Sequence, residues 1–195
     1  HGKVHFDAYY IIMNPGYTDK HLEEIKKNAK ILNIPIEIFA SDIFASVEVI
    51  GHKSPCYMCA RMRRGHLYNK ARELGCNKIA LGHHFDDVVK TYLLSLMYEG
   101  RISCFKPVTY LDRVGVTLIR PLLYTPEYFI RAFAQRQALP IVHNPCPADG
   151  TTKRQEDKDL HKALEKQNRG VRERIFGAIQ RYPLDGWAPD TTRYR

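Results

Sequence analysis

Short hydrophobic runs alternate with amphipathic segments along the first two thirds of the chain. Residues 7–14 are rich in Ile and Tyr and precede a Pro-Gly pair, which predicts a buried parallel strand. Residues 20–33 carry apolar side chains at helical spacing, with Thr18 or Asp19 as the cap, and residues 34–40 alternate as a second strand does. This order predicts two parallel strands joined by a right-handed crossover.

The same alternation continues towards residue 143. The pattern predicts helices over 63–74, 86–98 and 126–137, and short strands over 78–82, 116–119 and 140–143. Pro126 suits the first turn of the third of these helices. Alternating strands and helices predict an α/β fold, with a parallel sheet that helices cover on both faces.

The end of the chain has a different pattern. From Thr151 onward the sequence is polar, and it predicts helices over 155–167 and 171–181. No long linker rich in Ser, Pro or Gly separates this part from the rest. We therefore expect an α/β domain over 1–150 and a basic helical appendage over 151–195.

The composition is that of a globular chain with a positive charge. The 195 residues are 44% hydrophobic and 26% charged, which excludes disordered, collagen-like and coiled-coil classes. Thirty Lys and Arg against 21 Asp and Glu give a net charge of +9, which favours a polyanionic partner. The longest apolar runs, such as 8–13, are too short to cross a bilayer, and no signal peptide opens the chain. We expect a cytoplasmic protein with no membrane partner.

The five cysteines are few and odd in number, which argues against a disulfide framework. Cys56 and Cys59 form a C-x2-C pair, whose spacing lets both thiolates bind one metal centre from a tight turn. Cys146 stands between two prolines, in a stiff loop that could hold a third ligand. We expect structural roles for the other two, Cys76 and Cys104.

The spacing of the cysteine pair does not separate zinc from an iron–sulfur cluster. A redox pair and two incidental thiols are alternatives, although a redox C-x2-C usually opens a helix, and here a basic run follows. A fourth zinc ligand would come from one of five histidines: His52, His66, His83, His84 or His143.

A second candidate site is the segment Gly82-His83-His84-Phe85-Asp86-Asp87, between a predicted strand and the next helix. In open α/β sheets, ligands bind outside the carboxyl ends of the strands. Glycine allows the backbone to approach a base or phosphate, a helix start favours anions, and carboxylates can hold Mg²⁺ beside a nucleotide. The alternative is that both aspartates only cap the helix.

Basic side chains gather next to the cysteine pair. Arg63 and Arg64 could clamp phosphates through paired donors, and Tyr57 and Tyr68 could stack on bases. Arg120 follows a predicted strand, at the edge where ligands bind. The alternatives are a solvated helix face for the basic run and a structural role for Arg120. The sequence has no Gly-Gly pair, no G-x4-G-K-[ST] and no G-x-G-x-x-G, so it lacks the usual phosphate cradle.

Together these segments resemble the tRNA 2-thiocytidine synthetase family of PP-loop ATP pyrophosphatases. Residues 56–65 are similar to the family's C-x-x-C segment with its R-R-G, and residues 79–87 to its G-H-H-x-D-D segment. Arg120-Pro121-Leu122 looks like its R-P-L, and Cys146 stands where the third cluster cysteine is expected. Residues 152–156 and the helices after them are similar to its C-terminal part. The resemblance covers nearly the whole chain.

The resemblance implies a Rossmann-like parallel sheet of the adenine-nucleotide alpha-hydrolase (PP-loop) type, with a C-terminal helical appendage. It implies a tRNA sulfurtransferase in which ATP, with Mg²⁺, adenylates the C2 carbonyl oxygen of the cytidine at tRNA position 32, and sulfur then displaces AMP. A [4Fe-4S] cluster would be held by Cys56, Cys59 and Cys146. Arg63 and Asp87 would be the catalytic residues, with Asp87 near the magnesium. The cofactor-binding residues would be Met13, Gly82, His83, His84, Arg64 and Arg120.

The resemblance also implies partners, and this sequence departs from the family's pattern in two places. The partners would be tRNA, a sulfur donor such as a cysteine desulfurase or sulfide, and a second copy in a homodimer. The family's Ser-Gly-Gly-x-Asp-Ser loop is absent, so we expect the first strand, that loop and the first helix to lie before His1 and this chain alone to bind ATP poorly. Lys90 stands where the family often has an acidic residue.

Two alternatives remain at this point. A related tRNA 2-thiouridine synthetase would use the same three cysteines, but it would be expected to carry zinc-finger cysteines, which this sequence lacks; a tRNA lysidine synthetase lacks the cysteine trio. A non-catalytic RNA-binding module with a structural zinc ion would explain the charge, the cysteines and the missing loop. It would leave the segment from Gly82 to Asp87 unexplained beyond helix capping.

Overall fold

The computed structural model describes residues 5–50, 55–143, 145–146, 163–182, 184 and 187. The chain forms two compact units. The first unit comprises His1–Lys70 and Ala138–Asp149, and the second unit comprises Ala71–Gln137 and Gly150–Arg195. The predicted boundary between residues 150 and 151 lies outside the described residues and stays a prediction. No helix in the described part of the chain is both long enough and apolar enough to cross a bilayer.

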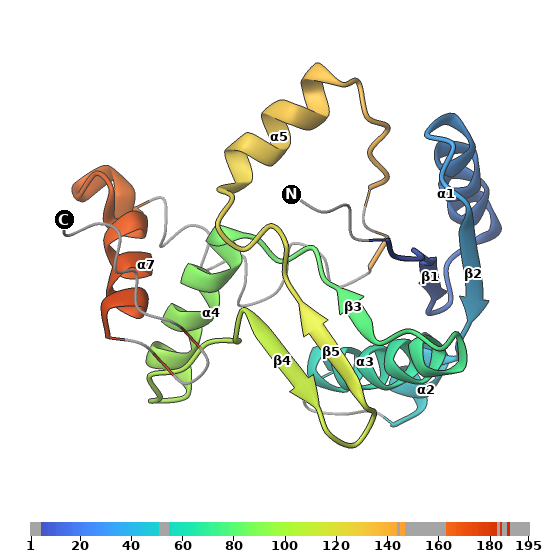
Figure 1. The fold of residues 1–195 in the computed structure, drawn as a ribbon, viewed down its shortest axis with the longest axis horizontal. Helices are drawn as coiled ribbons and strands as arrows, with labels where there is room; N and C mark the ends of the chain where they lie inside the picture. Colours follow the sequence, from blue (N-terminus) through green and yellow to red (C-terminus); the bar gives the residue numbers. More distant parts are fainter. Residues whose placement is uncertain are drawn as a thin grey trace. The chain divides into compact units, whose positions relative to one another are not determined.

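The first unit contains the predicted strand–helix–strand order. β1 (Tyr10–Asn14) pairs in parallel with β2 (Ile36–Ala40), with Tyr10 opposite Ile36, and α1 (Asp19–Ile31) connects the two strands (Figure 1). Both strands begin two or three residues later than the sequence predicts. The parallel pairing confirms the interpretation of the apolar runs as strands of an α/β fold.

The end of α1 explains how the chain turns into β2. The backbone N–H of Leu32 donates to the Asn28 carbonyl at 3.0 Å, and that of Ile34 donates to the Ala29 carbonyl at 2.9 Å. Between them Asn33 has a positive φ of 52°, a conformation that Asn tolerates better than most residues. At the other end Thr18 is the N-cap residue, but its side chain makes no capping hydrogen bond.

Two helices of the first unit differ from the prediction. α2 (Ile43–Ile50) was not predicted, and α3 (Pro55–Glu73) begins eight residues before the predicted start. Pro55 stands at the first helical position, where the fixed backbone angle of proline suits a helix. Gly65, in the interior, does not break the helix, and a Cβ there would meet open space. The C-x2-C pair therefore lies at the start of a helix, and the expected tight turn is wrong.

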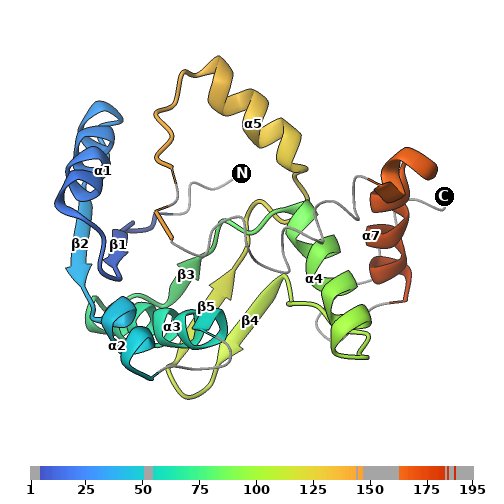
Figure 2. The ribbon, with the colours of Figure 1, turned by 180° about the vertical axis from the view of Figure 1, so that it is seen from behind.

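The second unit contains a three-stranded sheet in the order β3-β5-β4 (Figure 2). β3 (Lys78–Ala80) is parallel to β5 (Val116–Ile119), whereas β4 (Val108–Leu111) is antiparallel to β5. β5 has the predicted bounds, β3 is shorter than predicted, and β4 was not predicted. The strand expected over 140–143 is wrong, since these residues are irregular and pair with no described strand.

The helices of the second unit follow the prediction more closely. Among them are α4 (Phe85–Tyr98), α5 (Glu127–Arg136) and α7 (Val171–Arg181). Pro126 is the N-cap of α5 rather than a residue of its first turn. Of the helix expected over 155–167, the structure describes residues 163–167, which are helical, and the segment 152–156 lies outside the described residues.

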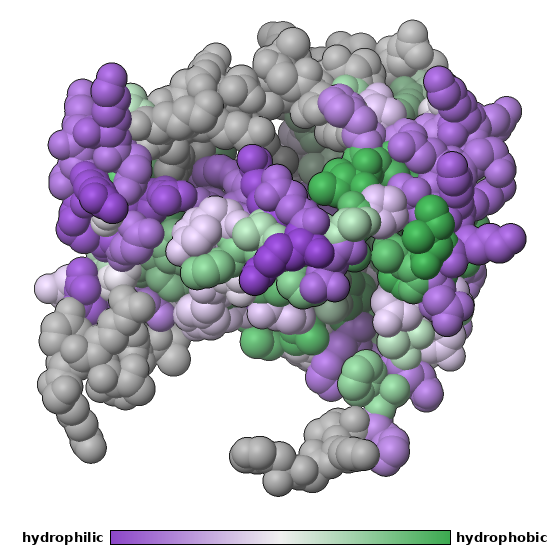
Figure 3. All heavy atoms as spheres, turned by 90° about the horizontal axis from the view of Figure 1, so that it is seen from above, coloured by the Kyte–Doolittle hydropathy of each residue, from purple (hydrophilic) through white to green (hydrophobic). Residues whose placement is uncertain are grey.

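The core of the second unit joins α4 to α7. Val88 and Val89 of α4 are fully buried, and the rings of Phe85 and Phe176 stack with their centroids 4.5 Å apart. Trp187 meets the Phe176 ring edge-on, which fixes the chain after α7 to the same cluster. On the molecular face in Figure 3, hydrophilic residues cover most of the described surface, and hydrophobic groups lie between them.

Candidate functional site: a pocket, a cysteine trio and a strand-end loop

The carboxyl end of β1 is shaped by one asparagine side chain. Asn14 Oδ1 accepts hydrogen bonds from the backbone N–H groups of Gly16, at 3.0 Å, and Tyr17, at 2.6 Å. Gly16 has a φ of 120°, and a Cβ there would meet the Phe44 side chain at 3.1 Å, so glycine is required. This turn sets Tyr17 next to His21, with ring centroids 4.9 Å apart.

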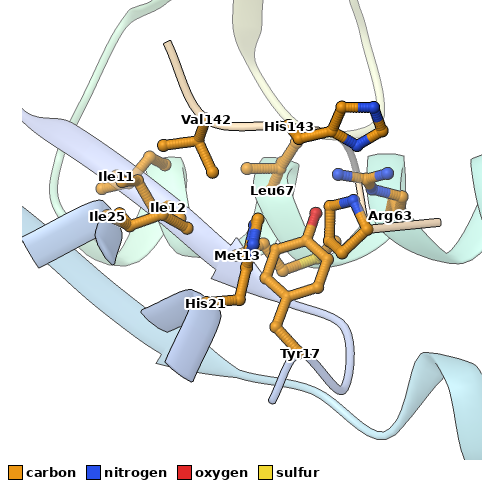
Figure 4. A pocket seen from close by; sticks show the side chains of 11 residues that line it. Ile11, Ile12, Met13, Tyr17, His21, Ile25, Arg63, Leu67, Val142 and His143 are labelled. Atoms are coloured by element: carbon orange, nitrogen blue, oxygen red, sulfur yellow. The ribbon is translucent and has the colours of Figure 1, made fainter. Parts of the chain in front are cut away.

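A pocket of about 370 Å³ opens beside this turn, within the first unit. Its apolar side comes from β1, α1, α3 and the segment before Cys146. Figure 4 shows the side chains of Tyr17, Arg63 and His143 pointing toward one another at the pocket's polar side. The lining residues are Ile11, Ile12, Met13, Tyr17, His21, Ile25, Arg63, Leu67, Val142, His143 and Pro145.

The pocket brings together two residues that the sequence predicts for the site. Met13 is 5% exposed and lines it from β1, and Arg63 lines it from α3. Arg64 is not among the lining residues; it is exposed, and its Nε donates to the Ala60 carbonyl of the same helix at 3.2 Å. An apolar wall with a guanidinium at one side suits a planar ring that carries an anionic group. Sequence reasoning missed Tyr17, His21 and the pocket role of His143.

The three predicted cluster cysteines interact within the same unit. Burial raises the pKa of Cys59, and the neighbouring Cys146 and Cys56 raise this pKa further. The Arg63 guanidinium, which hydrogen-bonds the Cys59 sulfur, lowers the pKa and opposes these effects. Three thiols in one electrostatic group beside a cation form a site where a positive metal centre would stabilise the thiolates.

The spacing of these thiols bears on the kind of metal centre. In the described part of the chain, no three His, Cys, Asp or Glu side chains are grouped closely enough to hold one metal ion. In an iron–sulfur cluster each cysteine binds a different iron, so the sulfurs lie further apart than the ligands of a single zinc. The described residues therefore form no ready-made site for a single metal ion, and the kind of metal centre at the cysteine trio stays a prediction.

The predicted strand-end loop lies in the second unit. A Cβ at Gly82 would meet no atom within 4 Å, which leaves its backbone open to a ligand. Asp87 Oδ2 accepts the backbone N–H of His84 at 3.1 Å and lies 3.4 Å from His84 Nε2. Asp87 thus caps the start of α4 while keeping 32% of its side chain exposed.

Asp86 has a structural role. Only 5% of the residue is exposed, and its Oδ2 accepts the backbone N–H of Glu127 at 2.7 Å. Its Oδ1 accepts a hydrogen bond from Arg172 Nη1, also at 2.7 Å. Asp86 therefore ties the start of α4 to the starts of α5 and α7. Its partner Arg172 was missed because 86 positions separate the two residues in the chain, and no local spacing marks the pair.

Two more predicted ligands of the second unit, Arg120 and His83, lie next to the Phe105 ring. The Arg120 guanidinium lies 4.8 Å from the centre of the Phe105 ring, and its Nη1 donates to the Lys106 carbonyl. The His83 ring lies 4.8 Å from the same ring. These contacts show that Arg120 supports the segment before β4, and its role as a ligand stays a prediction. Lys90 pairs with Glu127, with Nζ 3.7 Å from Oε2.

The two cysteines outside the trio lie in the second unit. Cys104 packs against the core cluster, and burial raises its pKa to about 11. Cys76 is half-buried. It follows Gly75, a positive-φ residue just beyond the end of α3. The position of Cys104 agrees with the structural role predicted for it.

Comparisons with known proteins agree with these features. The PP-loop domain family matches residues 16–176. A tRNA-cytidine(32) 2-sulfurtransferase from Citrifermentans bemidjiense is 32% identical over 183 residues, covering 90% of this chain and 71% of that protein. One from Geobacter sulfurreducens is 44% identical over 138 residues, covering 68% of this chain and 54% of that protein.

A solved structure is similar in fold. It is the U34-tRNA thiolase NcsA from Methanococcus maripaludis with its [4Fe-4S] cluster, with a TM-score of 0.70 and 25% identity over 88% of this chain and 60% of that one. The chain spans about half the length of several curated relatives, for example 43% and 51% of two of them. On these matches, this α/β chain belongs to the PP-loop family and, within it, to the family of the tRNA-cytidine(32) 2-sulfurtransferases.

Proposed function

We propose that this chain is part of a tRNA sulfurtransferase that uses ATP to replace the C2 oxygen of the cytidine at tRNA position 32 by sulfur. One observation carries the proposal: the first unit holds three interacting thiols, and Arg63 both contacts one of them and lines the adjacent pocket. The names of the curated relatives and the cluster of the solved tRNA thiolase support it.

The proposed reaction has two steps. The C2 carbonyl oxygen attacks the α-phosphorus of ATP, so that an O–P bond forms and pyrophosphate leaves. Sulfur at the oxidation level of sulfide then attacks C2, the C–O bond breaks, and AMP leaves with the oxygen. Arg63 would neutralise the charge on the phosphoryl oxygens in both steps, because a guanidinium offers paired donors to a phosphate.

Cys56, Cys59 and Cys146 would hold a [4Fe-4S] cluster, which supplies an iron without a cysteine ligand for the incoming sulfur. Met13 would lie against the adenine. Asp87 would contact the magnesium through the part of its carboxylate that helix capping leaves exposed. The further nucleotide ligands would be Gly82, His83, His84, Arg64 and Arg120.

The proposal also includes the sulfur donor, the location and the oligomeric state of the enzyme. A cysteine desulfurase or sulfide would supply the sulfur, the site of action would be the cytoplasm, and the enzyme would be a homodimer. Because the chain spans only about half the length of several curated relatives, the ATP-dependent step is to be measured on the full-length protein.

Metal analysis after anaerobic purification tests the proposal on the chain itself. We expect about four irons and four sulfides per chain, with broad visible absorbance. Cys56→Ala and Cys146→Ala should each abolish iron loading, since each removes one of three ligands. Cys76→Ala is the matched control, because this half-buried thiol lies outside the trio, and it should load iron as the parent does.

Three outcomes would contradict the proposal. One zinc and no iron per chain would favour a structural RNA-binding module. Unchanged iron in Cys56→Ala and Cys146→Ala would show that other residues hold the metal. For the full-length protein, the expected result is ATP-dependent formation of 2-thiocytidine in a tRNA transcript, and its absence with an intact cluster would disprove the assigned reaction.

A further inference from the structure

Asp86 connects the starts of three helices in the second unit. Its Oδ2 accepts the Glu127 N–H at the start of α5, and its Oδ1 accepts Arg172 Nη1 at the start of α7, both at 2.7 Å. Beside them, the backbone N–H of Phe85 donates to the Thr125 carbonyl at 3.2 Å. The side chain of Asp86 is 7% exposed and that of Arg172 is 28% exposed, so water screens the attraction between these two charges only weakly.

Arg172 is held from its other side as well. Its Nε lies 3.7 Å from Glu165 Oε2, and both atoms are buried. The other carboxylate oxygen of Glu165 accepts the Gly170 N–H at 2.7 Å, which fixes this carboxylate at the start of α7. The guanidinium therefore lies between two carboxylates, and its planar fork of donors has a defined orientation.

The residues next to Asp86 in the strand-end loop are ones proposed to bind the nucleotide and its magnesium. His84 Nδ1 lies 3.9 Å from Asp86 Oδ2, and His84 Nε2 lies 3.4 Å from Asp87 Oδ2. The backbone N–H of His84 also donates to Asp87 Oδ2. A continuous series of polar groups thus leads from Arg172 on α7, through Asp86, to His84 and Asp87.

The two adjacent carboxylates have different surroundings because of Arg172. The guanidinium neutralises Asp86, whereas Asp87 keeps 32% of its side chain exposed. Without Arg172, the charge on Asp86 would be unpaired, and it would attract the His84 ring and any cation near the loop. Asp86 would then compete with Asp87 for both. Arg172 therefore leaves Asp87 as the carboxylate that is available to a metal ion.

The packing of α4 against α7 does not depend on an ion pair. These helices share an apolar core, in which Phe85 stacks on Phe176 and Val88 is fully buried (Figures 1 and 2). Apolar side chains of similar volume often hold two elements together as well as a buried ion pair does. The charged pair beside the loop is therefore better explained by its effect on the loop than by its effect on stability.

We propose that Arg172 is a positioning residue of the nucleotide site: through Asp86 it holds His84 and Asp87 in the orientation in which they receive ATP and its magnesium. This inference rests on the proposed function of the strand-end loop. It makes the start of α7 a part of the site, although Arg172 acts only through Asp86, which lies 86 positions before it in the sequence.

Amide hydrogen exchange of the purified chain tests the positioning without ATP, tRNA or a cluster. Three backbone N–H groups report on the junction, namely those of His84, Phe85 and Glu127. Arg172→Gln removes the positive charge. In this variant the exchange of the three reporter amides should accelerate at least about tenfold more than that of the buried Leu93, because local opening adds to global unfolding.

Three further variants control this measurement. Arg174→Gln is the matched control, because Arg174 is exposed on the same helix and hydrogen-bonds the segment just before it; its reporter amides should exchange as in the parent. Arg172→Lys keeps a positive charge beside Asp86 and should stay within about threefold of the parent. If Arg172→Gln does not fold, Glu165→Gln replaces it, since it removes a charge that faces Arg172 and should give the same pattern to a smaller extent.

Kinetics of the full-length protein test the consequence for the site. In Arg172→Gln, the magnesium concentration that gives half-maximal 2-thiocytidine formation should rise at least about tenfold, and Arg172→Lys should lie between this value and that of the parent. A merely structural role would lower the fraction of folded enzyme and thus kcat alone, because a half-saturating concentration does not depend on how much enzyme is active. Arg174→Gln should match the parent in both quantities.

Exchange that accelerates equally at the three reporter amides and at Leu93 would overturn the proposal, because Arg172 would then act on the whole fold. A half-saturating magnesium concentration that is unchanged in Arg172→Gln, with only kcat reduced, would overturn it too. A parent enzyme that forms no 2-thiocytidine would instead disprove the proposed function, and the amide exchange would still decide whether Arg172 holds the loop.

Discussion

At the residue scale, the buried Asp86 carboxylate depends on Arg172. Arg172→Ala would leave that carboxylate without its cation while only 5% of Asp86 is exposed. We expect the free energy of unfolding to fall by about 3 kcal/mol, as when one partner of a buried ion pair is removed. Urea denaturation followed by circular dichroism would measure the change.

Arg131→Ala is the matched control for this prediction. Arg131 also pairs with a carboxylate, Glu127 at 2.6 Å, but 73% of its side chain is exposed. Exposed pairs contribute less than about 1 kcal/mol, so this variant should remain close to the parent. A loss in Arg172→Ala no larger than the loss in Arg131→Ala would show that the Asp86 contact does not stabilise the fold.

Cys104 gives a prediction on pH. Its pKa is about 11 in the folded chain, against an ordinary value of 9.0, because burial disfavours the thiolate. The neutral thiol therefore stabilises the fold fully below pH 9, and this contribution is lost as the pH rises towards 11. We expect the parent to lose more unfolding free energy than Cys104→Ala between pH 8 and pH 11. Equal losses would mean that the thiol titrates normally in the fold.

At the element scale, the junction of α1 and β2 depends on one left-handed residue. Asn33→Val should lower the free energy of unfolding by about 1–2 kcal/mol, because a β-branched side chain is strained at a φ of 52°. Asn33→Gly should keep or slightly raise stability, since glycine adopts this conformation without strain. Thermal unfolding of the two variants measures the difference, and a valine variant as stable as the glycine variant would contradict the assigned cause.

The same scale shows what the sequence could predict and why. Periodicity found α1, α4, α5 and α7, because their apolar positions repeat along one face. It placed the start of α3 too late, since the segment around the cysteines has no amphipathic pattern to mark it. It predicted a strand over residues 140–143 because a short apolar run has the same pattern whether it forms a strand or lines a pocket. Val142 lines the pocket.

The sequence could predict those parts of the candidate site whose residues lie close together along the chain. Arg63 and the cysteine pair follow from residue types close together in the sequence, whereas Met13 follows from the resemblance to the family, and the structure brings Met13 and Arg63 to one pocket. Contacts between distant segments left no signal in the sequence. The Asp86–Arg172 pair, whose residues lie 86 positions apart, is such a contact.

At the scale of the whole molecule, the net charge of +9 sets an expectation for tRNA binding. Each phosphate that a Lys or Arg neutralises releases counterions, so affinity falls as salt rises. We expect the dissociation constant for a tRNA transcript to rise at least about tenfold between 50 and 200 mM KCl. Filter binding across this series gives the slope of the logarithm of affinity against the logarithm of salt concentration.

Charge variants locate the part of the surface that produces this slope. Arg61 and Arg64 are exposed on α3 next to the cysteine trio, so the double variant Arg61→Ala/Arg64→Ala should make the slope shallower by one to two units. Lys26→Ala/Lys30→Ala removes the same charge from α1 and should change it less, because Lys26 is already paired with Glu23 at 2.7 Å. If both pairs of variants lowered the slope equally, the attraction would come from the overall charge of the molecule, and the face of α3 would have no special part in holding the tRNA.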